Sequence, residues 1–382
     1  MPFGIYIHWP FCESKCPYCD FNSHVAADID AVAWRDAYLR ELDYYLPETS
    51  GREVTSIFFG GGTPTLMPPD VMASVIGHIK VNWPPSADLE ITAEANPSSA
   101  EVAVFEQFLE AGVNRLSIGV QSFRDEDLVF LGRPHMAADG RKAIDSAAKH
   151  FDRWSFDLIY ARPGQSVEDW REELNEALDY APTHLSVYQL TIEPGTDFHR
   201  QRVAAADENA GTELFESTQE ILEDAGVPGY EISNHAAHGQ ECRHNLLYWQ
   251  GDDYLGIGPG AHGRLTTPGS ENVPKTETIQ TFRDPSKWLR RVKEARSGVQ
   301  KRLKLSPEER RDELILMGLR LRDGISTGQF KHLTGTDLPD QFDPVTISRL
   351  VEGGFLEKTD SALKTTPAGR LRLNAVIEAL LT

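Results

Sequence analysis

The sequence predicts an α/β fold, namely a partial (β/α)6 TIM-like barrel with a small C-terminal winged-helix-like α+β domain. Two observations lead to this prediction. Short β-rich runs alternate with helix-periodic segments over the first half of the chain, and this alternation is typical of parallel strands joined by right-handed crossovers. The last part of the chain combines helical signals with a pair of short β-rich runs, which is typical of a small winged unit.

The barrel elements come first, within a predicted domain over residues 1–228. Six β-rich runs are expected as strands, at 5–8, 55–59, 90–93, 115–120, 156–160 and 185–190. The segments between them with helical periodicity include 34–46, 70–79, 100–111 and 167–180. Six such units indicate a barrel or an incomplete one.

A loop-rich segment is expected next, over residues 229–300. It is rich in Gly, Asn, His and Pro and has long stretches without a clear period. Loops of this length are uncommon unless they are disordered or functional. Its aromatic residues, Tyr230, Tyr248 and Trp249 among them, argue against disorder. We therefore expect the segment to pack on the barrel.

A third domain is expected over residues 301–382. Ser306, Pro307 and Glu308 form a helix start with an N-cap, a proline in the first turn and an acidic residue beside it. Two further short helices and a hairpin over 355–358 and 362–365 complete the winged-helix-like unit. Its positive and negative residues are nearly balanced, so it lacks the cationic stripe of a DNA-binding helix.

Charge and hydropathy restrict the partners of the chain. The 382 residues carry a formal net charge of −20, which repels nucleic acid and anionic lipid. We expect no nucleic-acid partner. No apolar stretch is long enough for a membrane span, and the first residues lack the basic start of a secretory signal. A cytoplasmic location is expected.

Three of the four cysteines, Cys12, Cys16 and Cys19, fall on one short loop. In a reducing compartment such a group is more often a metal site than a set of disulfides. Three thiolates can hold a [4Fe–4S] cluster and leave one iron open to an exogenous ligand. A zinc loop is the alternative from spacing alone, with Asp20, His24 or Cys242 as a fourth ligand.

Polar residues and glycines gather where barrel chemistry is expected, at or just past the carboxyl ends of strands. The second predicted strand ends in the run Gly-Gly-Gly-Thr-Pro, residues 60–64. No lysine follows this run, so it is not a P-loop. Glu94 ends the third strand, Gln121 follows the fourth and Asp157 lies in the fifth, with Arg133 on the element after Gln121. A zwitterionic, ribose-bearing cofactor would need such groups.

The cysteine loop, the preceding Tyr-Ile-His-Trp-Pro-Phe of residues 6–11 and the glycine run resemble the radical S-adenosylmethionine superfamily. The resemblance implies a barrel of that type and a cluster whose open iron is chelated by the amino and carboxylate groups of S-adenosylmethionine. One electron then cleaves the cofactor to a 5′-deoxyadenosyl radical. The glycine-rich turn is expected to bind the methionine amino group through its backbone.

Three further runs narrow the resemblance. Glu-Ala-Asn-Pro at 94–97, Arg-Leu-Ser-Ile-Gly-Val-Gln-Ser-Phe at 115–123 and Asp-Leu-Ile-Tyr at 157–160 are similar to the oxygen-independent coproporphyrinogen oxidase family. The resemblance extends to the last domain and is densest in the first half of the chain. It implies S-adenosylmethionine contacts at the matching positions, which are Tyr6, Gly61, Gly62, Thr63, Glu94, Gln121, Arg133 and Asp157.

Two departures favour the HemW branch of this family, whose members are heme chaperones. The decarboxylating oxidases carry a further cysteine where this chain has Phe21, and they have an N-terminal extension that this sequence lacks. The expected function is to bind the cluster, S-adenosylmethionine and heme, and to pass heme to acceptor proteins such as membrane respiratory enzymes. An electron donor for the cluster is a further expected partner. The alternative is oxidative decarboxylation of coproporphyrinogen III to protoporphyrinogen IX.

The run His-Asn-Leu-Leu-Tyr-Trp at 244–249 resembles the HNxxYW signature of HemW proteins. A neutral imidazole is a common axial ligand of heme iron, and Tyr248 and Trp249 could pack on the macrocycle. His244 is therefore the first candidate for a heme ligand, against the alternative of a structural histidine. Cys242 is interpreted as a spare thiol, because a c-type attachment site would need a second cysteine.

The run Gly-Ile-Gly-Pro-Gly-Ala-His-Gly at 256–263 resembles a dinucleotide fingerprint, but no helical pattern follows it. The family resemblance implies instead that this loop borders the cofactor pocket. His262 is a second candidate for a heme or pocket residue.

Overall fold

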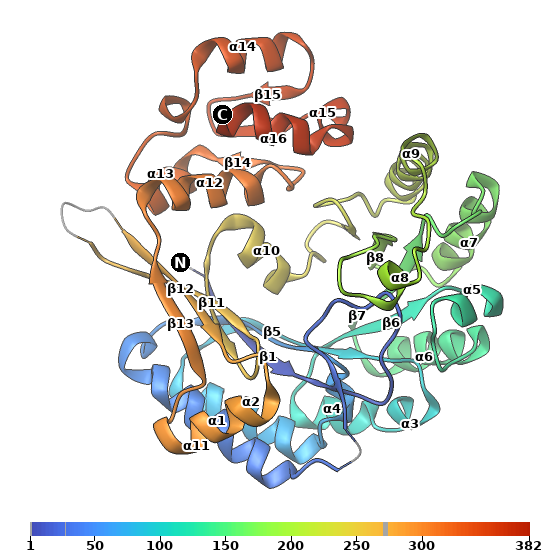
Figure 1. Cartoon of the computed structure of the whole chain (residues 1–382), viewed down its shortest axis with the longest axis vertical. Helices are drawn as coiled ribbons and strands as arrows, with labels where there is room; N and C mark the ends of the chain where they lie inside the picture. The colour runs from blue at the N-terminus through green and yellow to red at the C-terminus, as the bar shows by residue number, and fades with distance from the viewer. Residues whose placement is uncertain (1, 27, 270–273) are drawn as a thin grey trace.

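A computed structural model describes residues 2–26, 28–269 and 274–382. An 11-stranded sheet forms its centre (Figure 1). Six parallel strands follow one another across it in chain order, which are β1 (Phe3–Trp9), β4 (Val54–Gly61), β5 (Pro85–Ala95), β6 (Arg115–Gln121), β7 (Arg153–Tyr160) and β8 (His184–Gln189). The six expected strands are thus present, and the α/β class is confirmed.

Helices follow the strands, and the longer ones cover the outer face of the curved sheet (Figure 1), whereas α8 packs against the cysteine loop. Their bounds are α1 (Ala31–Thr49), α2 (Pro69–Asn82), α3 (Ser99–Val102), α4 (Phe105–Ala111), α5 (Asp125–Phe130), α6 (Ala137–His150), α7 (Val167–Asp179), α8 (Asp197–Arg200) and α9 (Glu208–Asp224). The helix expected over 100–111 is wrong as one unit, because it is split into α3 and α4. Val102 and Val104 flank the break, and β-branched residues are weak helix formers.

Both faces of the parallel strands are covered, so their side chains are buried on both sides. Every residue of β6 is buried, for example. Large aromatic side chains join the helices to the sheet, such as Trp170 of α7, whose Nε1 donates to Thr218 of α9 at 2.8 Å. Burial of such a side chain contributes about 1.5–3 kcal/mol.

The segment expected to be loop-rich extends the central sheet instead. It contains β9 (Asn234–Ala236), α10 (Arg243–Gln250), β10 (Asp253–Ile257), β11 (His262–Thr267), β12 (Lys275–Thr281), α11 (Pro285–Ala295) and β13 (Val299–Lys304). β10 pairs in parallel with β1, and β11, β12 and β13 continue from it as antiparallel strands. The expectation of little regular structure here was wrong, because these strands are specified by pairing with a distant edge and not by local periodicity.

The chain after β13 has a hydrophobic core of its own, which includes Leu314, Phe330 and Leu356. Its elements are α12 (Pro307–Gly318), β14 (Ile325–Ser326), α13 (Thr327–Thr334), α14 (Pro344–Glu352), β15 (Leu356–Lys358), β16 (Ala362–Thr365), α15 (Pro367–Leu371) and α16 (Leu373–Leu381). Ser306 caps α12 as expected, and β15 pairs with β16 as the expected hairpin. The helices α15 and α16 add to the predicted unit. The domain boundaries near 228 and 301 stay predictions.

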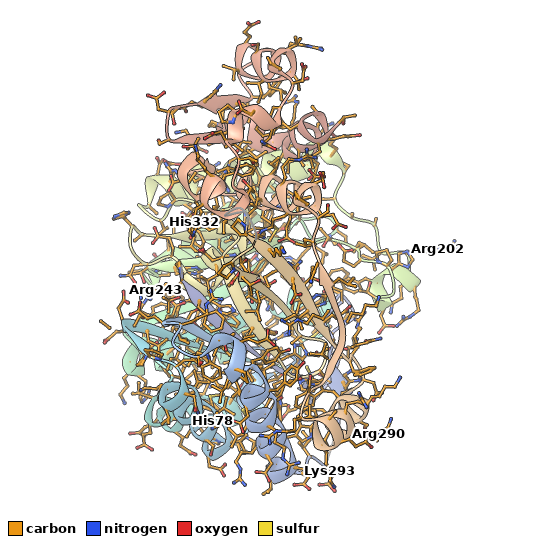
Figure 2. The ribbon with its side chains drawn as sticks, turned by 90° about the vertical axis from the view of Figure 1, so that its left-hand side faces the viewer. His78, Arg202, Arg243, Arg290, Lys293 and His332 are labelled. Carbon is orange, nitrogen blue, oxygen red and sulfur yellow. The ribbon has the colours of Figure 1, made fainter. Side chains whose placement is uncertain are left out.

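The position of α10 matters for function. Figure 1 shows it between the curved sheet and the C-terminal helices. In the other view, Figure 2 shows Arg290 and Lys293 together on α11 and His332 in the C-terminal unit. Among the residues that the structure describes, no helix is both long and apolar enough to cross a membrane.

Candidate cofactor site at the carboxyl ends of the strands

A cavity of about 360 Å³ opens at the carboxyl ends of the parallel strands. This is the edge where sites of such barrels form. Its lining brings together ten of the predicted site residues, which are Cys12, Cys16, Cys19, Gly61, Gly62, Thr63, Glu94, Gln121, Arg133 and Asp157. Tyr6, His244 and His262 are not among the lining residues.

The three cysteines lie between β2 (Phe11–Cys12) and β3 (His24–Val25), two short strands that pair with each other. All three side chains are partly exposed and unbridged. Burial, together with the charges of the neighbouring cysteines, raises the pKa of the Cys12 and Cys19 thiols. These thiols are therefore protonated at neutral pH, and metal binding must displace their protons.

Each cysteine sulfur has a hydrogen-bond partner. Thr63 Oγ1 donates to Cys12 Sγ at 3.5 Å, and Arg133 Nη1 donates to Cys16 Sγ at 3.4 Å. Cys19 Sγ and the hydroxyl of Ser23 are 3.7 Å apart. A set of thiols with donors aimed at their sulfurs fits an iron–sulfur cluster, whose sulfurs are commonly hydrogen-bonded.

The zinc alternative needs a fourth ligand close by. His24 and Cys242 have other partners, whereas Asp20 lines the same cavity as the cysteines. Asp20 is exposed to solvent, and His24 is 3.3 Å from the side-chain oxygen of Asn22. Cys242 is buried at the start of α10, where its thiol donates to Glu90. In the described part of the chain, no three His, Cys, Asp or Glu side chains converge on a point for a single ion. A cubane has its irons at separate corners, so its ligands need not converge in this way.

The glycine run forms a turn that passes directly behind the cysteine loop. Gly62 N donates to Trp9 O at 2.7 Å, and Thr63 N donates to Phe11 O at 2.8 Å. A Cβ on Gly62 would lie 2.6 Å from Phe11 O and 3.0 Å from Cys12 Sγ, so only glycine fits. Gly61 has a φ of +117° and donates its N–H to Glu94 at 3.1 Å. Because these donors are already used, a cationic amino group fits this turn better than an anion.

Two carboxyl groups face the cavity, Glu94 from β5 and Asp157 from β7, the strands on either side of β6. Burial, and then the negative charge of Asp157, raises the pKa of Glu94 from 4.5 to about 8. Burial also raises the pKa of Asp157 from 3.8 to about 6, although Ser186, Arg115 and Ser117 oppose this shift. Such groups would gain from a bound cation or from ribose hydroxyls, because either would replace lost hydration. Perturbed carboxyls in a cavity are typical of functional sites.

Gln121 and Arg133 line another side of the cavity. Gln121 ends β6 with a φ of +69°, a backbone conformation that non-glycine residues rarely adopt and that often marks a binding site. Of the predicted residues that line the cavity, Arg133 is the cationic one. Its Nε is buried and has no hydrogen-bond partner. A carboxylate ligand could satisfy this group.

Tyr6 lies below the cavity, inside the barrel. Its hydroxyl is 3.1 Å from Nδ1 of His8, whose Nε2 is 3.0 Å from Asn22 O at the end of the cysteine loop. Tyr6 thus reaches the loop through His8 and does not line the cavity. A direct contact between Tyr6 and S-adenosylmethionine stays a prediction.

His244 lies on α10 near the start of the strands, at the opposite end of the barrel from the cysteines. It is only 1 % exposed, and its two ring nitrogens are 2.8 Å from Ser56 Oγ and 2.7 Å from Tyr248 Oη. Burial lowers its pKa to about 3, so the ring is neutral. Iron ligation would require one of these two hydrogen bonds to break. The heme assignment therefore stays a prediction, and the geometry is that of a satisfied core histidine.

The loop that contains His262 contacts the back of the cysteine loop. The side chain of Asn22 donates to Pro259 O and to Arg283 O, both at 2.9 Å. His262 itself is exposed at the start of β11. The loop therefore supports the cysteine loop from behind, whereas the resemblance implied that it borders the pocket.

Sequence reasoning missed the residues that support the site. Asn96 lies two positions after Glu94 and bonds to both Thr63 and Arg133. Tyr18, inside the cysteine loop, accepts from Arg133 Nη1 at 3.5 Å. The signals for Asn96 were its place just past the end of a strand and its presence in the run Glu-Ala-Asn-Pro. Nothing local indicated the anchoring role of Asn22.

Comparison with known proteins places the chain among relatives of its full length. Residues 6–177 match the family model "Radical SAM superfamily", and residues 305–372 match "HemN C-terminal domain". The heme chaperone HemW of Escherichia coli is 36 % identical over 100 % of this chain and 98 % of its own length. Radical S-adenosyl methionine domain-containing protein 1, mitochondrial, of Mus musculus is 39 % identical over 85 % of this chain and 74 % of its own.

A solved structure has the same fold. Coproporphyrinogen III oxidase (HemN) from Escherichia coli aligns with a TM-score of 0.81 over 99 % of this chain and 89 % of that one. The sequence identity of this pair is 22 %, so the match concerns the fold alone.

Proposed function

We propose that this chain, which belongs to the HemW-type family of radical S-adenosylmethionine proteins, holds a [4Fe–4S] cluster and S-adenosylmethionine in the cavity and carries heme to acceptor proteins. One observation carries the cofactor part of this proposal. The three cysteines share one cavity with the glycine turn, two perturbed carboxylates and Arg133. This set matches a cluster with an open iron beside a zwitterionic ligand.

Each of the predicted residues in the cavity would have a separate role. Cys12, Cys16 and Cys19 would ligate the cluster, which when reduced supplies an electron to bound S-adenosylmethionine. Glu94 would lose its proton when a cationic group of the cofactor arrives, because opposite charge lowers a raised carboxyl pKa. Arg133 would meet the carboxylate of the cofactor.

The cluster is tested by anaerobic reconstitution with iron and sulfide. We expect iron and sulfide contents of a cubane, and an electron paramagnetic resonance signal of the reduced protein that changes when S-adenosylmethionine is added. Cys16→Ala should lose the cluster, whereas Cys242→Ala, the buried cysteine outside the loop, should keep it. Retention of the full cluster by Cys16→Ala would contradict the assignment, and so would zinc in place of iron.

The heme part of the proposal rests on the full-length relationship to proteins that are called heme chaperones. We propose His244 as the iron ligand, released from Tyr248 or Ser56 when heme binds. The test is heme titration with detection of a Soret band, followed by transfer to a heme-free acceptor protein. His244→Ala should weaken binding, and the control is His332→Ala, on the exposed side of α13 (Figure 2).

Coproporphyrinogen decarboxylation is the competing function. Phe21, where the oxidases have a cysteine, is 62 % exposed at the rim of the cavity. An apolar ring cannot supply the thiolate that those enzymes have there. Anaerobic incubation of the reconstituted protein with coproporphyrinogen III, reductant and S-adenosylmethionine decides the matter. Protoporphyrinogen IX formed over many turnovers would overturn the chaperone proposal.

We propose the acceptor proteins and the electron donor by their chemical class. The acceptors would be apoproteins with an open heme site, with respiratory enzymes of a membrane as one class. The donor would be a low-potential one-electron carrier. A cytoplasmic location is proposed with them, and cell fractionation tests it.

A further inference from the structure

Two of the three cluster cysteines receive their hydrogen bonds from residues that share one partner. That partner is Asn96, just beyond the end of β5. Its Nδ2 donates to Thr63 Oγ1 at 2.9 Å, and Thr63 in turn donates to Cys12 Sγ at 3.5 Å. Its Oδ1 accepts from Arg133 Nη2, while Nη1 of the same guanidinium donates to Cys16 Sγ at 3.4 Å.

The amide of Asn96 fits both tasks because it carries a donor and an acceptor on one planar group. By accepting on Oδ1 it fixes the plane of the Arg133 guanidinium. By donating to Thr63 Oγ1 it occupies a lone pair of that oxygen, so that the hydroxyl hydrogen is free to point at Cys12. Among the standard side chains of this size, neither Asp nor Leu can do both.

Asn96 is itself held in place by a buried carboxylate. Its backbone N–H donates to Glu101 Oε2 at 2.7 Å, and Glu101 is only 3 % exposed. The guanidinium of Arg133 has a further fixed partner in Gly119 O at 3.0 Å. The donors to Cys12 and Cys16 are therefore set by the fold before any cofactor binds.

We propose that Asn96 is a positioning residue that sets the reduction potential of the cluster through Thr63 and Arg133. This inference rests on the proposed cluster. Reduction adds one electron to the cluster from a low-potential one-electron donor and moves no proton. The added negative charge is stabilised by hydrogen bonds to the thiolate sulfurs and by a nearby cation. Both effects raise the potential, and both depend on the orientation that Asn96 imposes.

The experiment is a redox titration of the reconstituted holoprotein with dithionite as reductant, monitored by electron paramagnetic resonance, with iron content measured in parallel. Asn96→Ala should shift the midpoint potential to more negative values. The matched control is Asn114→Ala. The side chain of Asn114 also both donates and accepts, because it accepts from Ile91 N and donates to Leu89 O of β5, both at 2.8 Å, but it lies before the start of β6, away from the cysteines. The control should keep the wild-type potential.

A second variant keeps the test decisive if Asn96→Ala fails to take up iron. Thr63→Val preserves the shape of the side chain and removes only the hydroxyl that donates to Cys12, so it too should lower the potential. If Asn96→Ala takes up the cluster and keeps the wild-type potential, the inference is overturned. If it takes up no iron, a wild-type potential in Thr63→Val overturns the inference instead. Absence of a cluster from the wild-type protein would instead overturn the proposed function.

Discussion

Glu94→Gln should change how the stability of the protein depends on pH. Burial raises the pKa of Glu94 from 4.5 to about 8 in the folded chain, whereas the unfolded carboxyl keeps its ordinary pKa near 4.3. Between these two values the folded state holds a proton that the unfolded state has released. Stability must therefore fall as the pH rises through this window and stay low above it.

The size of this effect follows from the shift. One pKa unit corresponds to about 1.4 kcal/mol, so a shift of this size is worth on the order of 3–5 kcal/mol between the two ends of the window. The slope is at most about 1.4 kcal/mol per pH unit. Between about pH 7 and 8.5, Glu94 alone should thus remove roughly 1–2 kcal/mol. Glutamine cannot ionise, so Glu94→Gln should remove this pH-dependent loss of stability.

Urea unfolding of the metal-free and cofactor-free chain across that pH range measures the slope. Buried histidines contribute little over this range, and their contribution is the same in both variants. The pKa of His8 is lowered to about 4 and that of His244 to about 3, so both are neutral in the folded state. In the unfolded state, with a pKa of about 6.5, they are mostly neutral above pH 7. Glu41, with a pKa raised by burial to about 7, contributes equally to both variants. The control is Glu106→Gln, at an exposed position of α4. Parallel stability curves for the wild type and Glu94→Gln would refute the reasoning.

Three further predictions concern the packing of the site and of α10. Gly62→Ala should reduce iron uptake severalfold, because its Cβ would collide with Phe11 O and Cys12 Sγ. The control Gly77→Ala has open space around its Cβ and should take up iron normally. The iron content of the reconstituted proteins measures both effects. His244→Ala should lower the free energy of unfolding by about 2–4 kcal/mol, since it leaves the buried hydroxyl of Ser56 and the half-buried hydroxyl of Tyr248 without their partner. An unchanged urea midpoint would contradict this. Cys242 should react with a thiol reagent only after unfolding, because it is 1 % exposed and burial raises its pKa to about 12. Rapid labelling of Cys242 in the native protein would contradict this prediction.

Much of the barrel could be predicted because its signals are local. Each parallel strand is a short apolar run between helical segments, and the positions of Glu94 near the end of β5 and of Asp157 within β7 follow from the runs themselves. The cysteine spacing and the glycine run are equally local. The sequence could therefore predict which side chains line the cavity, whereas the cofactors that they would hold stay proposals.

The missed features depend on contacts between distant parts of the chain. β10 is a strand because it pairs in parallel with β1, and no pattern within 253–257 indicates this partner. Asn22 was overlooked for the same reason, since its side chain bonds to Pro259 and Arg283. The residues that hold the cysteine loop are thus less visible in the sequence than the residues that would hold the cluster.

The HNxxYW run packs inside the barrel, and the proposed heme site would use the same histidine. In α10 its histidine stacks on Phe58, with ring centroids 5.2 Å apart, and on Tyr6 at 6.2 Å. Tyr6 continues through His8 to Asn22 on the cysteine loop. If heme iron takes His244 from Tyr248 or Ser56, the ring must move within this stack, and the motion reaches the support of the cysteine loop. Occupancy of the heme site and the state of the cluster would then be coupled energetically, and by linkage the coupling must be the same in both directions. A cluster-free protein with the same heme affinity as the loaded one would exclude that coupling.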